Sequence, residues 1–294
     1  MRQPERFVRR TATRGTPRGR PTFSHTPMST DPLREFLNRH SRLFVLTGAG
    51  CSTESGIPDY RDADGRWKRT PPVNFASFMG NESVRRRYWA RSLVGWPRVR
   101  AARPNGAHAA LSSLERQGRV ELLVTQNVDG LHQAAGTRQI VELHGRIDQV
   151  VCMTCAQRST RAALQERLLG ENPHWGQLPA LAAPDGDADL EGLPFEEFTV
   201  PPCEHCGGIL KPDVVFFGES VPRARVDQAF DALARAEALL VVGSSLMIYS
   251  GYRFAQAAAA AGMPIAAVNV GRTRADPLLT LKVSRPCAEA LAGL

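Results

Sequence analysis

The stretch LFVLTGAG, residues 43–50, is a short apolar run that ends in a pair of glycines. Five consecutive apolar or β-branched residues before a glycine turn are typical of a buried strand. Glycines after a strand let the backbone approach a pyrophosphate, and the helix N-terminus that follows directs N–H groups at it. We therefore predict a strand over residues 43–47 and a phosphate-binding turn over residues 48–50.

The same turn departs from the fingerprint of dinucleotide-dependent dehydrogenases. Gly48-Ala49-Gly50-Cys51-Ser52-Thr53 lacks the third glycine. An acid that binds the ribose is expected ~20 residues further on, at the end of the next strand. The nearby acids Asp59, Asp62 and Asp64 instead lie in a loop interrupted by proline and glycine. Ordinary redox chemistry is thus the least favoured use of this turn.

Strand and helix patterns alternate along the rest of the chain. Further strands are predicted at residues 121–125, 239–243 and 265–270, and helices at 31–40, 107–117, 223–236 and 252–261. Alternation of this kind predicts a parallel sheet covered by helices on both faces. The fold class is therefore α/β, a Rossmann-like doubly wound parallel sheet.

Two segments interrupt the alternation and suggest further substructures. Residues 60–104 are rich in Arg, Trp and Pro and predict a helical insertion, whereas residues 146–212 hold two cysteine pairs and predict a smaller subdomain. The main domain is then assigned to residues 31–145 and 213–294, with a basic and disordered tail at residues 1–30.

The net charge of +8 is concentrated near the N-terminus, because residues 1–27 contain seven arginines and one glutamate. A nearly neutral body argues against direct nucleic-acid binding. The tail is interpreted as disordered or as preceding a true start at Met28, and either interpretation leads us to expect a cytoplasmic protein. The alternative is a mitochondrial transit segment, which would place the protein in the mitochondrial matrix. No apolar run reaches the ~18–20 residues of a membrane helix, and none is expected. The oligomeric state cannot be read from the sequence.

Four of the six cysteines form two C-x-x-C pairs, Cys152 with Cys155 and Cys203 with Cys206. Each such turn can present two sulfurs to one tetrahedral ion, so the pairs predict a zinc site with four thiolate ligands. The 47 residues between the pairs exceed the usual ribbon spacing. Four thiolates leave the ion no open position, which favours a structural role. His205, between the last two cysteines, is not assigned as a ligand.

Several motifs together resemble the sirtuin family, in the order in which that family has them. They are GAGCSTESGIPDYRD (48–62), QNVDGLHQAAG (126–136), ELHG (142–145), the two cysteine pairs, KPDVVFFGE (211–219), GSS (243–245) and NVG (269–271). The resemblance covers about residues 31–294. LKPDVVFFG, GSSLMIYSGYRF and RYWAR with VGWP are most similar to the mitochondrial sirtuin-4 branch and its bacterial relatives.

The resemblance implies an NAD-dependent protein lysine deacylase of the deacetylase type. In that reaction the acyl oxygen of an acylated lysine attacks the anomeric carbon of the nicotinamide ribose, and nicotinamide leaves. The products are free lysine, nicotinamide and acylated ADP-ribose. NAD and zinc are the implied cofactors, and acylated lysines of proteins are the implied substrates. A protein ADP-ribosyltransferase and a non-catalytic NAD-sensing scaffold remain the alternatives.

The resemblance assigns catalysis to His144, Asn127 and Asp129. His144 follows an apolar strand, and an imidazole with an ordinary pKa near ~6.5 can accept a proton at neutral pH. Outside this motif, a lone histidine is more often structural. Asn127 and Asp129 equally suit the turn that follows a strand. His132 is assigned to packing or to a local hydrogen bond.

The remaining site residues are also implied by the resemblance. NAD is expected to contact Gly48, Ala49, Gly50, Ser52, Ile57, Pro58, Asp59, Arg61, Gln126, Asn127, Asp129, Gly243, Ser244, Ser245, Asn269, Gly271 and Cys287. The cleft for the substrate is expected at Phe216, Phe217, Gly218 and Met247. Arg61 is predicted to pair with a diphosphate charge or, alternatively, with Asp59 or Asp62. Phe75–Met79 with Trp67 lines a long acyl pocket or packs the helical insertion.

Overall fold

The computed structural model describes residues 31–68, 72–178, 181–182, 187–190 and 192–294. The predicted basic tail and the alternative start at Met28 lie outside these residues. The structure divides into two units, Met1–Asp31 and Pro32–Leu294, and the second contains all the helices and strands described.

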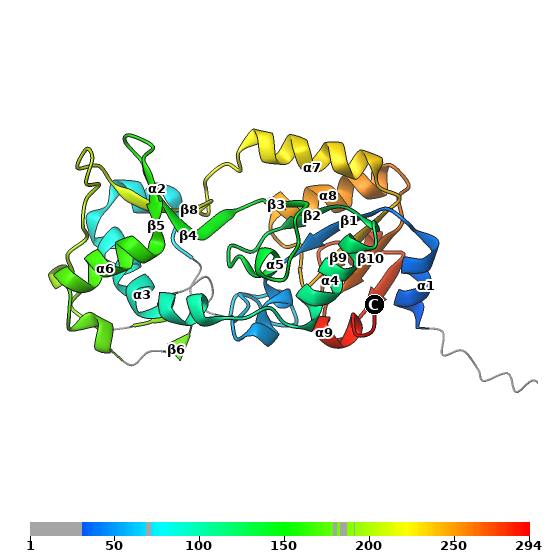
Figure 1. Ribbon diagram of the computed structural model, residues 1–294, viewed down its shortest axis with the longest axis horizontal. Coiled ribbons are helices and arrows are strands. Elements are labelled where there is room, and N and C mark those ends of the chain that lie inside the picture. The colour runs from blue at the N-terminus through cyan, green and yellow to red at the C-terminus, as the bar shows by residue number, and fades with distance from the viewer. Residues whose placement is uncertain (1–30, 69–71, 179–180, 183–186, 191) are drawn as a thin grey trace, which may run out of the picture. The chain divides into compact units, whose positions relative to one another are not determined.

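A six-stranded parallel sheet forms the larger part of this unit, with strand order β11-β10-β9-β1-β2-β3 (Figure 1). Its strands are β1 (Leu43–Thr47), β2 (Val120–Thr125), β3 (Ile140–Glu142), β9 (Ala238–Val242), β10 (Ile265–Val268) and β11 (Leu281–Val283). β1 lies between β2 and β9, and all five of its residues are buried. The α/β fold class is therefore confirmed.

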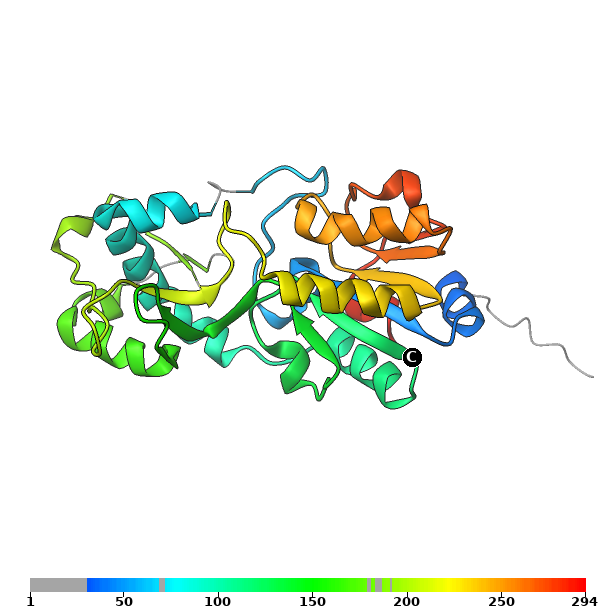
Figure 2. The same cartoon turned by 90° about the horizontal axis from the view of Figure 1, so that it is seen from above.

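Helices cover both faces of this sheet because alternate residues of β1 point to opposite sides. Val45 packs with α1 (Pro32–Arg39), α4 (Gly106–Arg116) and α9 (Cys287–Ala290). Phe44 and Leu46 pack with α7 (Arg223–Arg235) and α8 (Tyr249–Ala260), which lie on the other side (Figure 2). The observed helices and strands match the predicted ranges closely. The largest difference is α8, which begins at Tyr249, three residues before its predicted start, and β10 ends at Val268, two residues before its predicted end.

A second layer of structure lies beside the parallel sheet and contains the cysteine pairs. Its antiparallel sheet has the order β5-β4-β8. The strands are β4 (Gly145–Cys152), β5 (Arg158–Thr160) and β8 (Leu210–Val214). β4 and β8 pack with α2 (Phe75–Gly80), α3 (Glu82–Ala101) and α6 (Arg161–Glu171) around a separate apolar core. The predicted boundary at residue 145 coincides with the start of β4, although the domain boundaries themselves stay predictions.

The remaining elements are short. They are the helix α5 (Leu131–Ala134), the strands β6 (Leu181–Ala182) and β7 (Ala188–Asp189), and the 3-10 turns η1 (Ala49–Cys51), η2 (Thr53–Ser55), η3 (Trp175–Gln177), η5 (Phe195–Glu197) and η6 (Asp276–Leu278). Among the described residues, no helix combines the length and the apolar character needed to cross a membrane.

Candidate functional site

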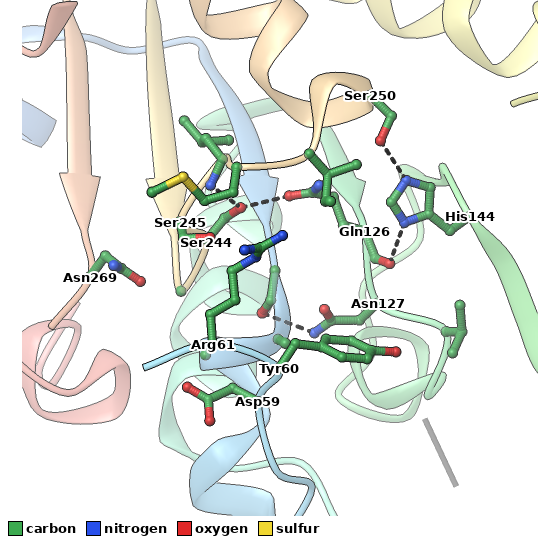
Figure 3. Close-up of a pocket in the computed structure, with 18 of the residues that line it drawn as sticks. Asp59, Tyr60, Arg61, Gln126, Asn127, His144, Ser244, Ser245, Ser250 and Asn269 are labelled. Carbon is green, nitrogen blue, oxygen red and sulfur yellow. Dashed lines mark hydrogen bonds between the residues drawn. The ribbon is translucent and has the colours of Figure 1, made fainter. Parts of the chain in front are cut away.

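The carboxyl ends of the parallel strands open into a cavity of about 1250 Å³. Open α/β sheets place their ligands at this edge. Figure 3 shows that the side chains of Gln126, Asn127, His144 and Ser244 converge here from different strand ends. The predicted residues that line the cavity are Gly48, Ala49, Gly50, Pro58, Asp59, Arg61, Gln126, Asn127, His144, Phe216, Phe217, Gly218, Gly243, Ser244, Ser245, Met247, Asn269, Gly271 and Cys287.

The glycine turn brings the ends of β1 and β9 into contact. Gly50 N donates to Gly243 O at 2.8 Å, and Gly48 N donates to Val242 O at 3.1 Å. Gly243 has a φ of +63°, and a Cβ on it would lie 2.2 Å from Cys51 N. The turn therefore requires glycine on both strands.

The helix N-terminus expected after this turn is not that of a regular α-helix. The chain instead forms two successive 3-10 turns, η1 and η2, and the second ends at Gly56 with a φ of +84°. Gly56 and Pro58 end the helical path here, because glycine adopts the left-handed conformation readily and proline lacks the N–H that a continuing helix needs. The backbone groups that face the cavity at this turn therefore belong to short 3-10 turns and not to the N-terminus of a long α-helix.

His144 lies in the connection from β3 to β4, where its ring is held at both nitrogens. Nδ1 is 2.9 Å from Gln126 O, and Nε2 is 2.8 Å from Ser250 Oγ. A carbonyl oxygen only accepts, so Nδ1 carries the proton and Nε2 accepts from the Ser250 hydroxyl. Burial, assisted by Arg253 and Arg225, lowers the pKa of His144 to about 4 against the effect of the Gln126 hydrogen bond. His144 is therefore a neutral imidazole with its basic atom on the cavity side.

Asn127 and Asp129 are connected through one hydroxyl. Asn127 Nδ2 donates to Gly48 O at 3.1 Å and to Ser52 Oγ at 3.0 Å, and Ser52 Oγ donates to Asp129 Oδ2 at 2.7 Å. Asp129 Oδ1 also accepts from Leu131 N at 2.9 Å, which is the turn contact that the sequence allowed. Asp129 and Ser52 do not line the cavity and instead support Asn127 from behind.

The loop at Asp59–Arg61 forms one wall of the cavity. Arg61 stacks on the Trp67 ring at 3.8 Å and donates to Gly65 O at 2.7 Å. Its predicted alternative partners are otherwise engaged, since the Asp59 carboxylate pairs with Lys68 and the Asp62 carboxylate accepts from backbone N–H groups. In its described contacts the Arg61 guanidinium is therefore not paired with a carboxylate. Its charge is available for the predicted contact with a diphosphate.

Ile57 is another predicted contact that does not line the cavity. Its side chain is buried among apolar residues that include Trp96 and Val128. An isoleucine between the glycine and proline of this loop anchors the loop by burying apolar surface. Ile57 therefore supports the wall and does not line it.

Ser244 and Asn269, which are both predicted to contact NAD, already make hydrogen bonds within the cavity wall. Ser244 Oγ donates to Gln126 Oε1 at 2.6 Å, and Asn269 Nδ2 donates to Gly271 O at 2.9 Å. Cys287 begins α9, and burial raises the pKa of its thiol to about 12. Cys287 is thus a neutral thiol at physiological pH.

The predicted substrate residues form the opposite wall. Phe217 O accepts from Phe75 N at 2.8 Å, and the Phe217 ring meets Trp67 edge-on at 5.6 Å. The strand before this segment, β8, ends at Val214, so Phe216, Phe217 and Gly218 follow it in a loop. Phe78 packs against Phe216 within the apolar core of the smaller layer. Of the two interpretations of Phe75–Met79, packing is therefore correct, and only Trp67 lines the cavity.

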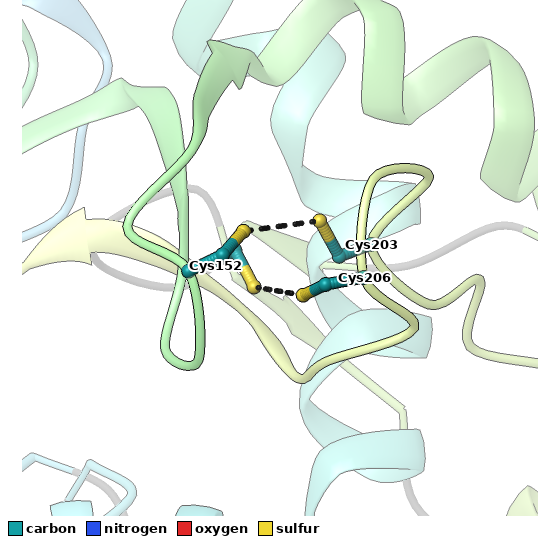
Figure 4. A group of neighbouring side chains, drawn as sticks. Cys152, Cys203 and Cys206 are labelled. Atoms are coloured by element: carbon teal, nitrogen blue, oxygen red, sulfur yellow. Dashed lines mark hydrogen bonds between the residues drawn. The ribbon is translucent and has the colours of Figure 1, made fainter.

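The four paired cysteines converge at the ends of β4 and β8 (Figure 4). Their sulfurs lie within 4.8 Å of one another, with Cys152 Sγ 3.5 Å from Cys206 Sγ and Cys155 Sγ 3.8 Å from Cys203 Sγ. Zinc–sulfur bonds of ~2.3 Å in a tetrahedron require sulfurs about 3.8 Å apart, so the cluster fits zinc. Backbone N–H groups of Cys155 and Thr154 lower the pKa of Cys152 to about 6. A thiolate ligand is therefore available at neutral pH.

Sequence reasoning missed several residues of the cavity. Tyr60 lines it beside Arg61, and Ser250 and Arg253 reach it from α8. The pattern of α8 shows its apolar face, but the contact with His144 depends on how two distant segments meet. Tyr60, within the DYRD motif, had a local signal because it stands between two predicted contacts.

Known proteins resemble this chain over most of its length. A family model described as the Sir2 family matches residues 48–250. A protein of Bordetella bronchiseptica named NAD-dependent protein deacetylase is 65% identical over 260 residues, which are 88% of this chain and 95% of that protein. A protein of the same name from Xanthomonas campestris pv. campestris is 64% identical over 262 residues, 89% of each chain.

A solved structure of the same family also matches the fold of this chain. Sir2 with a deacetylated p53 peptide and 3'-O-acetyl ADP ribose matches with a TM-score of 0.72 at 29% identity, covering 90% of this chain and 96% of that one. Family model, relatives and structure agree with the resemblance that the motifs carry. The chain therefore belongs to the Sir2, or sirtuin, family.

Proposed function

We propose that the protein is an NAD-dependent protein lysine deacylase that transfers the acyl group to ADP-ribose and releases nicotinamide. The relatives at 64–65% identity are named for NAD-dependent deacetylation. The cavity supports the proposal because its volume of about 1250 Å³ exceeds the ~300–1,000 Å³ of an ordinary small-molecule pocket. NAD and the end of an acylated lysine thus have room to meet.

The position of His144 Nε2 carries this proposal. The atom faces a cavity that has the glycine turn on one side and Phe217, Gly218 and Met247 on another. Bound NAD supplies the ribose carbon that the acyl oxygen attacks and the nicotinamide that leaves. His144 Nε2 then takes the proton of a ribose hydroxyl, since Nδ1 is committed to the Gln126 carbonyl.

The same geometry assigns supporting roles to neighbouring residues. Asn127 is fixed by Gly48 O and Ser52 Oγ, so its amide meets the ribose region in one orientation. Ser250 donates to His144 Nε2 before substrate arrives, so a ribose hydroxyl has to replace that contact. Trp67 and Phe217 offer apolar surface to the acyl chain.

Gly218 and Met247 suit the binding of an extended peptide. Within the described part of the chain, the backbone of neither residue has a hydrogen-bond partner. Unpaired backbone groups on two segments that line the cavity can pair with an extended peptide as an added strand. We therefore propose that the acylated lysine enters on such a strand.

The release of nicotinamide tests the proposal. The protein is incubated with NAD and an acetyl-lysine peptide, and free nicotinamide and deacylated peptide are measured. We expect both products in equal amounts, and only in the presence of the acylated peptide. Nicotinamide released without acyl-peptide, together with labelled protein, would instead indicate ADP-ribosyl transfer, and NAD binding without any nicotinamide would indicate a sensor.

A further inference from the structure

A second group of metal-binding side chains lies behind the glycine turn. Cys51 ends η1, His108 lies in the first turn of α4, and His132 lies in α5. Their exposed fractions are 0%, 0% and 1%. The Cys51 sulfur and one nitrogen from each histidine ring lie within 4.8 Å of one another. Three segments that are distant in sequence thus bring three donor atoms to one buried point.

His132 offers its Nδ1 lone pair to this point. Its Nε2 is 2.9 Å from Thr47 Oγ1, and the Thr47 hydroxyl donates to Thr125 Oγ1 at 2.9 Å. Thr47 Oγ1 therefore accepts, and Nε2 carries the proton of the ring. Among the described residues, the buried Nδ1 has no hydrogen-bond partner.

His108 has a complementary arrangement. Its Nδ1 lies 3.1 Å from Asn105 Oδ1, and the Asn105 amide is oriented by a 2.8 Å hydrogen bond from its Nδ2 to Cys51 O. Asn105 N also donates to Nδ1 at 3.3 Å, so without an ion Nδ1 accepts and Nε2 carries the ring proton. Metal binding requires the other tautomer, in which the proton lies on Nδ1 and is donated to Asn105 Oδ1, and the lone pair lies on Nε2. That buried Nε2 also has no partner in the described chain. Metal-binding histidines ordinarily hold an oxygen with the other ring N–H in this way.

We propose that Cys51, His108 and His132 bind one cuprous ion. One cysteine and two histidines in a trigonal arrangement are a copper ligand set, and a thiolate favours a soft cation. A single thiolate also neutralises the charge of Cu⁺, which suits a buried site. Zn²⁺ would leave one uncompensated charge and prefers a fourth ligand. The Cys51 thiol proton passes to solvent as the copper–sulfur bond forms, and the oxidation state of copper does not change.

The pKa values of the three side chains agree with the replacement of the thiol proton by a copper ion. Burial lowers the pKa of His132 to about 3 and lowers that of His108, so both rings are neutral without an ion. Burial also raises the pKa of the Cys51 thiol, with Cys287, Asp129 and Glu54 adding to the effect. The thiol is therefore protonated until a cation displaces its proton.

The site is coupled to the glycine turn through the backbone. Cys51 N donates to Gly48 O at 2.9 Å, and Thr47 immediately precedes that glycine. An ion bound here would hold η1, α4 and α5 together. Because it would bind only the folded chain, copper should raise the unfolding temperature.

Copper and zinc counts on the zinc-loaded protein test the proposal. Cu⁺ is delivered anaerobically from a weak chelator, free metal is removed, and both metals are counted. We expect one retained copper per chain, unchanged zinc and a raised unfolding temperature. Cys51→Ala should abolish copper retention and the temperature shift. Cys287→Ala removes the other isolated cysteine, which lies outside the trio, and should leave copper retention unchanged.

Several outcomes would overturn the assignment. Copper that displaces zinc would be bound by the four paired cysteines, and copper retained by Cys51→Ala would be bound elsewhere. A second zinc that depends on Cys51, without copper retention, would make the site a zinc site. If Cys51→Ala fails to fold, Cys51→Ser preserves the side-chain volume and replaces the soft ligand. X-ray absorption should show one sulfur and two nitrogen neighbours around the copper.

Discussion

The tautomer of His144 follows from a single backbone contact. The Gln126 carbonyl accepts only, so the ring proton stays on Nδ1 and Nε2 is the basic atom. This contact arises because residues at the ends of β2 and β3 are neighbours in the sheet. The E-L-H-G motif identified the histidine, whereas its tautomer and its contact with Ser250 needed the packing of α8 against the strand ends.

His144→Ala is expected to lower the rate at which deacylated peptide forms by ~10² to 10⁴, the usual effect of removing a general base. The substitution removes a partly exposed ring at the cavity wall, so fold and NAD affinity should persist. Turnover and NAD binding by calorimetry check this. His174→Ala, at an exposed position away from the cavity, is the matched control. An activity within threefold of the original protein would contradict the assignment.

The motifs predicted which residues lie at the site, but they did not predict which of them line the cavity and which support its wall. Asn127 and Gln126 follow a strand directly and line the cavity as predicted. Ser52, Ile57 and Asp129 belong to the same motifs but support the wall from behind. A motif records which residues occur together, and it does not separate contact with a ligand from support of a neighbour.

At the scale of elements, the close approach of β1 and β9 depends on Gly243. In Gly243→Ala the alanine has to adopt a left-handed backbone conformation, which lowers the free energy of unfolding by ~1–2 kcal/mol. Its Cβ also clashes with Cys51 N, and overpacking of this kind costs ~1–3 kcal/mol. Gly262→Ala is the matched control, because its φ is +67° and nothing lies within 4 Å of the added Cβ. Chemical unfolding should therefore show a clearly larger loss of stability for Gly243→Ala. Equal losses would mean that the approach tolerates a side chain.

The paired cysteines connect β4 to the loop before β8. Cys152→Ser is expected to lower zinc content, stability and turnover together, because the binding energy of a closed thiolate site is also folding energy, on the order of 10 kcal/mol for structural zinc. Metal analysis with thermal unfolding checks this. Cys287→Ser should leave the zinc content unchanged, since Cys287 is not part of the cluster. Freshly purified, folded protein without zinc would disprove the site.

The central elements could be predicted from sequence better than the peripheral ones. β1 matches its predicted range because a run buried on both faces has a strong pattern. β5 is fully exposed, and β11 has three residues, so neither carries a clear periodicity. The turns η1 and η2 replaced the expected helix because Gly56 and Pro58 interrupt it.

At the scale of the whole molecule, the cavity joins the glycine turn of the parallel sheet to a wall that follows β8. A peptide added as a strand at Gly218 and Met247 would be bound mostly through its main chain. Changing the acyl group should therefore alter turnover more than changing flanking residues does. A panel of acyl-lysine peptides in two sequence contexts measures both effects. Rates dominated by sequence context would refute the strand arrangement.

The folded protein should also lose stability in acid through His144. Its pKa is lowered to about 4 in the fold from an ordinary value near ~6.5, so the unfolded chain binds the proton more readily. The resulting stability is fully present above pH ~6.5 and is lost as the pH falls toward ~4. Between pH 7.5 and 5 the loss from this group is roughly 2 kcal/mol.

A comparison with His144→Gln isolates this contribution, because glutamine does not titrate and every other group, the zinc cysteines included, is common to both proteins. Unfolding free energies from denaturant titrations at pH 7.5 and 5 provide the measurement. We expect the original protein to lose about 2 kcal/mol more than the variant over this range. Equal losses would show that the folded protein holds His144 at an ordinary pKa, so burial of the ring would not keep the base neutral in weak acid.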